Sequence, residues 1–157
     1  MTGCAGRFAR LALWHAALWL ALALAPVAAL AAPSAAFVMD ARTGQVLIAQ
    51  NADARLHPAS LTKMMTLYVA FEAIRRGEVT LDTMVTVSAK AAAEPPSRLG
   101  LRSGQRISMR NLIRAAAIKS ANDAATAIGE AISGSEAAFA RRMTATARAI
   151  GMNNTTF

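Results

Sequence analysis

A chain of 157 residues has room for one domain or for part of a larger one. Its formal charge is +8, yet no basic run with interleaved aromatic residues appears, so we expect no nucleic-acid partner. The arginines instead predict a solvated basic surface that suits contact with anionic polymers.

Residues 1–31 have the pattern of a secretory signal peptide. Arg7 and Arg10 precede the uncharged run Leu11–Ala25, and small residues follow around Ala31. The apolar run is about 15 residues long, shorter than the roughly 20 that span a bilayer. We therefore predict cleavage after Ala31 or Ala32 and export to the periplasm, and not a permanent membrane anchor.

Removal of this segment leaves a mature chain without cysteine. Cys4 and His15 lie in the segment, and His57 is the one histidine that follows it. This excludes a thiol nucleophile, a disulfide and a cysteine-zinc site, and we expect no metal or cofactor. His57 is expected to be a polar loop residue, because a histidine across Pro58 from Ser60 is poorly placed to act as its base.

A β-hairpin and a long helix are predicted first in the mature chain. Residues 36–40 and 44–49 are β-prone runs joined by a turn over residues 41–44. Pro58 cannot lie inside a helix, so the helix is expected to begin near Ser60 and to end near residues 75–77. Its apolar residues cover more than one face, which predicts burial on most sides, with the methionines as core residues. These are Leu61, Met64, Met65, Leu67, Tyr68, Phe71 and Ile74.

Shorter elements are predicted after the central helix. Residues 83–88 form a short strand, and residues 91–104 form an irregular loop. Ser108 is expected to cap a helix over residues 109–118. Two more helices follow, one opening at residues 120–123 and one ending near Ile150.

Ser60 and Lys63 form the first candidate pair. Residues three apart on a helix are neighbours, which places the Lys63 amine against the Ser60 hydroxyl. A serine becomes a good nucleophile when a base takes its proton, and an amine removed from water gives up its own proton more readily. The alternative is an N-cap serine followed by a solvated lysine, and the tetrapeptide alone is too common to decide between them.

A second polar cluster, residues 119–123, interrupts an apolar helical pattern. Ser120, Asn122 and Asp123 are all residues that cap helices well, so an ordinary helix boundary is the simpler interpretation. Paired with Ser60 and Lys63, the cluster has another use. A second hydroxyl could relay a proton to a leaving group, and an asparagine amide could both contact a substrate carbonyl and hold a lysine amine.

The two clusters together carry a resemblance to a known family. Pro58-Ala59-Ser60-Leu61-Thr62-Lys63-Met64-Met65-Thr66 and Lys119-Ser120-Ala121-Asn122-Asp123-Ala124-Ala125 resemble the first two motifs of low-molecular-mass penicillin-binding proteins, the serine-type D-alanyl-D-alanine carboxypeptidases. The likeness extends over essentially the whole mature chain. It implies an α/β (α+β) fold in which a helical cluster lies beside an antiparallel sheet.

The resemblance also implies roles for individual residues. Ser60 would be the acylated nucleophile, Lys63 its base, Ser120 a proton relay and Asn122 a substrate contact. The third motif of the family, Lys-Thr-Gly, does not occur before Phe157. Residues 32–157 are therefore expected to be the amino-terminal part of a catalytic domain and to be inactive and poorly stable alone.

Partners and alternatives follow from the same resemblance. It implies peptidoglycan stem peptides ending in D-Ala-D-Ala as substrates and β-lactams as inhibitors, and it allows a peripheral membrane contact through a missing carboxyl-terminal segment. A serine β-lactamase shares the acylation motifs but must deacylate quickly, and the residues around Ser60 favour the carboxypeptidase. A non-catalytic peptidoglycan-binding fragment is the alternative that the missing third motif supports.

Overall fold

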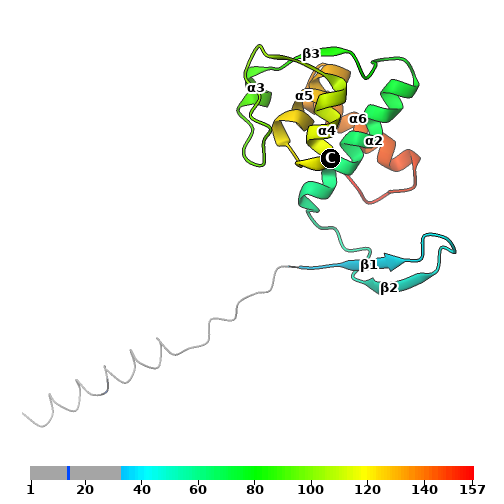
Figure 1. Cartoon of the computed structure of the whole chain (residues 1–157). Helices are drawn as coiled ribbons and strands as arrows, with labels where there is room; N and C mark the ends of the chain where they lie inside the picture. Colours follow the sequence, from blue (N-terminus) through cyan, green and yellow to red (C-terminus); the bar gives the residue numbers. More distant parts are fainter. Residues whose placement is uncertain (1–13, 15–32) are drawn as a thin grey trace, which may run out of the picture. The chain divides into compact units, whose positions relative to one another are not determined.

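The computed structural model describes Trp14 and residues 33–157, so the predicted signal peptide, Trp14 apart, lies outside the described residues. The chain divides between Ala52 and Asp53 into two compact units (Figure 1). Residues 53–157 hold both candidate clusters. Each unit is described by itself below.

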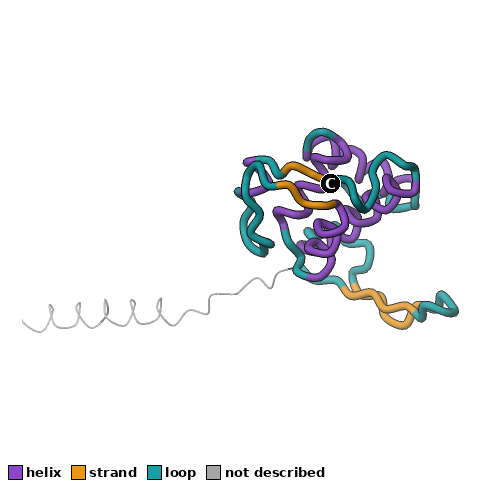
Figure 2. Tube along the Cα trace, turned by 45° about the horizontal axis from the view of Figure 1, so that its top comes forward, coloured by secondary structure: helices purple, strands orange, loops and turns teal. Residues whose placement is uncertain are grey.

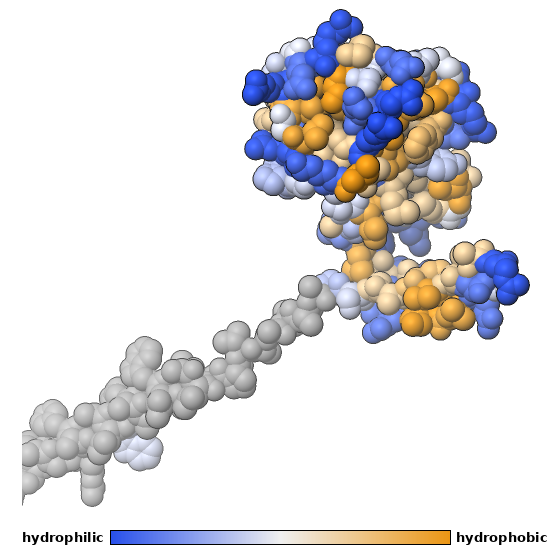
Figure 3. All heavy atoms as spheres, in the orientation of Figure 1, coloured by the Kyte–Doolittle hydropathy of each residue, from blue (hydrophilic) through white to orange (hydrophobic). Residues whose placement is uncertain are grey.

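The first unit contains the predicted hairpin. Strands β1 (Ala36–Met39) and β2 (Val46–Gln50) pair antiparallel. The Asp40 carboxylate closes the turn by accepting the backbone N–H groups of Arg42 at 2.9 Å and Thr43 at 2.7 Å. These bonds, with the Thr43 hydroxyl, hold the pKa of Asp40 below its ordinary value. Every residue of both strands is exposed, and Figure 3 shows hydrophobic atoms on the hairpin surface.

The second unit is a helical cluster with one short strand pair beside it (Figure 2). Its helices and strands, in chain order, are α2 (Thr62–Arg75), β3 (Met84–Thr86), α3 (Ala89–Ala92), β4 (Arg106–Ser108), α4 (Met109–Ile118), α5 (Asn122–Ser133) and α6 (Glu136–Ala149). A chain of helices and small antiparallel sheets confirms the predicted fold class. No helix in the described part of the chain is long and apolar enough to cross a bilayer.

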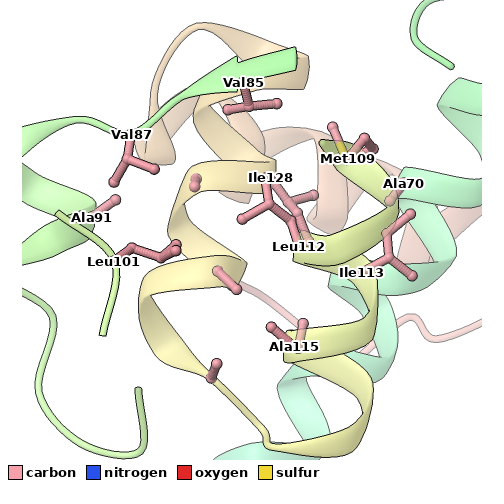
Figure 4. Packing of buried hydrophobic residues seen from close by; sticks show 14 residues of the cluster. Ala70, Val85, Val87, Ala91, Leu101, Met109, Leu112, Ile113, Ala115 and Ile128 are labelled. Atoms are coloured by element: carbon pink, nitrogen blue, oxygen red, sulfur yellow. The ribbon is translucent and has the colours of Figure 1, made fainter. Parts of the chain in front are cut away.

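The core lies where α4 and α5 meet. In Figure 4, Leu112 of α4 and Ile128 of α5 point toward one another, and both side chains are fully buried. Val87 and Leu101 join the same cluster from the segments flanking α3. A second cluster joins α2 to α6 through residues that include Val69 and Phe139. This packing holds α2 against α5, and those two helices begin at the two candidate motifs.

The structure adds two short elements that were not predicted and corrects one expectation about this unit. The strand β4 and the helix α3 were not predicted, because each is only three or four residues long and too short to show a periodic pattern. The helix α2 is not buried on most sides. One face, with Met65, Val69 and Ala73, is buried, whereas a stripe of large apolar residues on the other side is exposed: Leu61, Met64, Tyr68 and Phe71.

Candidate active site

Ser60 lies in a 3-10 turn, Ala59–Leu61, that precedes α2. The turn begins after Pro58, whose carbonyl accepts the N–H of Leu61 at 3.1 Å. Ala59 has a φ of 49°, a left-handed conformation that a residue with a Cβ rarely adopts. The α-helix itself therefore starts two residues later than expected, and Ser60 is presented on an exposed turn at its amino-terminal end.

Lys63 connects the first motif to the second. Its amine donates to Asn122 Oδ1 at 2.6 Å, across 59 residues of sequence, in a partly buried position. Among the described residues, Lys63 makes no hydrogen bond to Ser60. The amide oxygen thus fixes the position of the amine between the two motifs.

Asn122 is held from three directions. Its side-chain Nδ2 donates to the carbonyl of Pro95 at 2.9 Å, and its backbone N–H donates to the carbonyl of Ser97 at 2.7 Å. The side-chain nitrogen carries two hydrogens, and the described contacts use one of them. Asn122 can therefore hold the Lys63 amine and still donate to a second acceptor.

Ser120 occupies a strained and unusual position. It has a φ of 56°, and its buried Oγ has no hydrogen-bond partner among the described residues. It does not cap α5, because the N-cap residue is Ala121 and no side chain caps that end. A buried hydroxyl without a partner is rare in native proteins and calls for an explanation such as catalysis. The capping interpretation of this cluster therefore fails for Ser120.

Asp123 is the residue that sequence reasoning missed. It is fully buried, and its carboxylate accepts four backbone N–H groups at 2.9 Å each, those of Leu99, Gly100, Leu101 and Ala124. Burial raises the pKa of Asp123, but these four bonds outweigh it and hold the pKa below its ordinary value. The only signal in the sequence was an aspartate next to Asn122, which also fits a capping role.

The arrangement is suited to acyl transfer. It combines an exposed serine hydroxyl, a lysine amine three residues away, an amide fixed beside that amine and an unpartnered second hydroxyl two residues before the amide. Groups of these kinds can serve as a nucleophile, a base and a proton relay. No cluster of three His, Cys, Asp or Glu side chains that could hold a metal ion occurs in the described part of the chain.

Comparison with known proteins gives a consistent match. Residues 23–157 match the family model of the S11 peptidases, described as D-alanyl-D-alanine carboxypeptidase. The chain is 39% identical over 126 residues to the D-alanyl-D-alanine carboxypeptidase DacC of Escherichia coli, which covers 76% of this chain and 32% of that protein. It spans about a third of the length of the curated relatives it matches.

Solved structures agree with the sequence match. The D-alanyl-D-alanine carboxypeptidase DacD of Francisella tularensis superposes with a TM-score of 0.75 at 43% identity, covering 78% of this chain and 30% of that one. Penicillin-binding protein D2 of Listeria monocytogenes, in its ampicillin-bound form, superposes with a TM-score of 0.62 at 33% identity, covering 78% of this chain and 49% of that one. With its two motifs joined by the Lys63–Asn122 hydrogen bond, this chain belongs to the S11 peptidase family of D-alanyl-D-alanine carboxypeptidases.

Proposed function

We propose that the protein is a penicillin-sensitive, serine-type carboxypeptidase that removes the terminal D-alanine from peptidoglycan stem peptides through an acyl-enzyme on Ser60. The observation that carries this proposal is the 2.6 Å hydrogen bond from the Lys63 amine to Asn122 Oδ1. It brings the first two motifs of the family into one site within the second unit. The family match over residues 23–157 supplies the substrate class.

The reaction has two stages. In the first, Ser60 Oγ bonds to the carbonyl carbon of the scissile peptide while its proton passes to the neutral amine of Lys63. The C–N bond then breaks, and the leaving D-alanine amine takes a proton relayed through Ser120. In the second stage, a water oxygen bonds to the acyl carbon of the ester, and the bond from that carbon to Ser60 Oγ breaks. A proton from the water returns to Ser60 Oγ, and the shortened peptide leaves with a new carboxyl group.

The other residues of the site each have a task in this scheme. Asn122 Oδ1 fixes the Lys63 amine, and the second hydrogen of Nδ2 contacts a carbonyl of the substrate. The buried Oγ of Ser120, which has no hydrogen-bond partner among the described residues, is the relay. The predicted signal peptide would deliver the enzyme to the periplasm, where peptidoglycan is accessible. Sequencing the amino terminus of the protein from the envelope fraction tests this step.

The test is covalent labelling with penicillin. It is applied to the complete protein that the gene encodes. We expect mass spectrometry to place the adduct on the peptide containing Ser60, and Ser60→Ala to abolish it. Ser103→Ala, which changes an exposed serine in another turn, is the control and should label normally. Labelling that persists in Ser60→Ala would refute the assignment.

Two rates separate the carboxypeptidase from its alternatives. Release of D-alanine from a peptide ending in D-Ala-D-Ala separates it from a non-catalytic wall-binding protein. The rate at which the penicillin adduct is hydrolysed separates it from a serine β-lactamase, since a β-lactamase must clear the adduct rapidly. We expect D-alanine release and a persistent adduct.

A further inference from the structure

We propose that Asp123 is a positioning residue for acylation, which acts by fixing the segment Pro95–Leu101 against the turn that carries Ser120 and Asn122. The proposal rests on the proposed acyl-transfer function. Asp123 touches no reacting atom in the scheme above, so its influence must pass through its neighbours. The contacts that would transmit it are all within the second unit.

The Asp123 carboxylate acts as the anchor for one end of this segment. Oδ1 accepts the N–H of Leu99, and Oδ2 accepts the N–H groups of Gly100 and Leu101, each at 2.9 Å. Oδ1 also accepts the N–H of Ala124, in the first turn of α5. Three consecutive backbone groups of a loop are thus bound by one side chain at the start of a helix.

The other end of the segment is bound to the same turn by different groups. The carbonyl of Pro95 accepts Asn122 Nδ2 at 2.9 Å, and the carbonyl of Ser97 accepts the Asn122 N–H at 2.7 Å. The Ser97 hydroxyl donates to the carbonyl of Lys119 at 3.0 Å. The segment therefore braces both sides of Ser120, the residue with the strained backbone.

These hydrogen bonds between the segment and residues 119–123 determine where the Asn122 side-chain amide lies. The amide oxygen must reach the Lys63 amine while the amide nitrogen reaches Pro95, so the position of the segment sets the position of the base. Loosening the anchor at Asp123 frees Pro95–Leu101 to shift and takes the Asn122 amide with it. Small displacements of this kind are costly in catalysis, where about 1 Å can reduce a rate roughly 100-fold.

A carboxylate is required for the anchor because all four bound groups are donors. An amide of the same size would keep one acceptor oxygen and present N–H groups to the donors at the other position. Asp123→Asn therefore breaks the anchor with little change in volume. Glu78→Gln is the matched control, because it also replaces a carboxylate with an amide. Glu78 forms an ion pair with Arg142 and follows the carboxyl-terminal end of α2, whereas Lys63 lies at the amino-terminal end.

The experiment measures the second-order rate constant for acylation by penicillin. It uses the complete protein that the gene encodes. Wild-type acylation at Ser60 is checked first, so a failure of the proposed function is seen before any variant is compared. We expect Asp123→Asn, measured as folded protein, to acylate about 10-fold to 100-fold more slowly, and Glu78→Gln to acylate at the wild-type rate.

A double-mutant cycle distinguishes positioning from general destabilisation. If Asp123 acts through Asn122, then Asp123→Asn combined with Asn122→Ala should be within about twofold of Asn122→Ala alone. Rate losses that multiply in the double variant, or a folded Asp123→Asn that acylates normally, would overturn the proposal. Should Asp123→Asn not fold, Ser97→Ala tests the same brace, and an unchanged acylation rate in that variant would overturn it equally.

Discussion

Two serines define the site at the residue scale, and each lies beside backbone strain. Ala59, directly before Ser60, and Ser120 itself both have left-handed φ angles, and both carry a Cβ that disfavours them. Such strain persists where the surrounding structure fixes it, and it concentrates at functional sites. At Ser120 a second cost is added, because its buried hydroxyl has no partner among the described residues.

Replacing Ser120 with glycine should separate stability from activity. Glycine adopts a φ near 56° without strain, and the unpartnered hydroxyl is removed, so we expect Ser120→Gly to be more stable than Ser120→Ala by about 1 kcal/mol. Both variants should release D-alanine about 100-fold more slowly, since both lack the proposed proton relay. Thermal unfolding and D-alanine release measure the two effects. Wild-type turnover in Ser120→Ala would exclude Ser120 as the relay.

Lys63→Ala should strongly slow acylation without unfolding the protein. In the proposed mechanism the amine acts in the chemical step, so its loss should slow penicillin labelling by about 100-fold to 10,000-fold. The control is Lys90→Ala, which removes an exposed lysine paired with Glu136 and should label normally. Circular dichroism checks that both variants are folded. Equal labelling rates in the two variants would contradict the role of Lys63.

The Asp123 carboxylate should make the stability of the protein depend on pH in a predictable direction. The folded pKa of Asp123 lies below the ordinary value of 3.8, so its stabilising contribution is complete above that pH and is lost as the pH falls through the folded pKa. The stability gap between wild type and Asp123→Asn should therefore be constant above about pH 5 and narrow below about pH 3.8. Urea midpoints across this range measure the gap. The turn carboxylate of Asp40 and the ion-paired Glu78 have lowered pKa values in both proteins and cancel in the difference.

At the scale of elements, the packing of α5 on α6 depends on the absence of a side chain at Gly129. A Cβ added at Gly129 would lie 2.9 Å from Cδ1 and 3.0 Å from Cγ of Phe139, a ring that is only 4% exposed. Phe139 belongs to the cluster that also contains Val69 of α2. The glycine therefore allows the two helices to approach closely enough to cover that face of α2.

Gly129→Ala should destabilise the protein, although glycine-to-alanine changes usually stabilise a helix. We expect a loss of about 1–3 kcal/mol from the clash with Phe139. The double variant Gly129→Ala with Phe139→Leu should lose less than the sum of the single variants, because the smaller side chain relieves the contact. Chemical denaturation measures all three. A stabilised Gly129→Ala would show that the ring moves aside freely.

At the scale of the whole molecule, exposed apolar surface is the main feature. All residues of the hairpin strands are exposed, and so is the stripe Leu61, Met64, Tyr68 and Phe71 on α2 and the turn before it. Patches of this kind are unusual on an isolated soluble domain. A two-stranded hairpin is also marginal in water without further strands or packed helices.

We therefore expect a purified polypeptide of residues 32–157 to be inactive and to lack a cooperative fold of ordinary stability. Each large apolar side chain left in water forgoes about 1.5–3 kcal/mol of burial, against a net stability of roughly 5–15 kcal/mol for whole domains. Differential scanning calorimetry and D-alanine release test this expectation. A cooperative melt together with hydrolysis of a D-Ala-D-Ala peptide would contradict it.

The sequence by itself determined the local structure and the family. The hairpin follows from its β-prone runs and from a turn that Asp40 and Gly44 support, and α6 begins where Ser135 caps the N–H of Ala138. These features depend on residues within a few positions of one another, which is why a local pattern predicts them. The spacing of Ser60 and Lys63, together with the cluster at Ser120, was likewise enough to identify the family.

Only the tertiary structure decided how the site is held together. The bond from Lys63 to Asn122 spans 59 residues, and the bonds from Leu99, Gly100 and Leu101 to Asp123 span 22–24. Their formation depends on how α2, α4 and α5 pack, and no periodic pattern encodes which buried polar groups will then meet. The same packing exposes one side of α2, which its apolar sequence predicted to be buried. A pattern records which residues are apolar, whereas their burial depends on which elements lie against them.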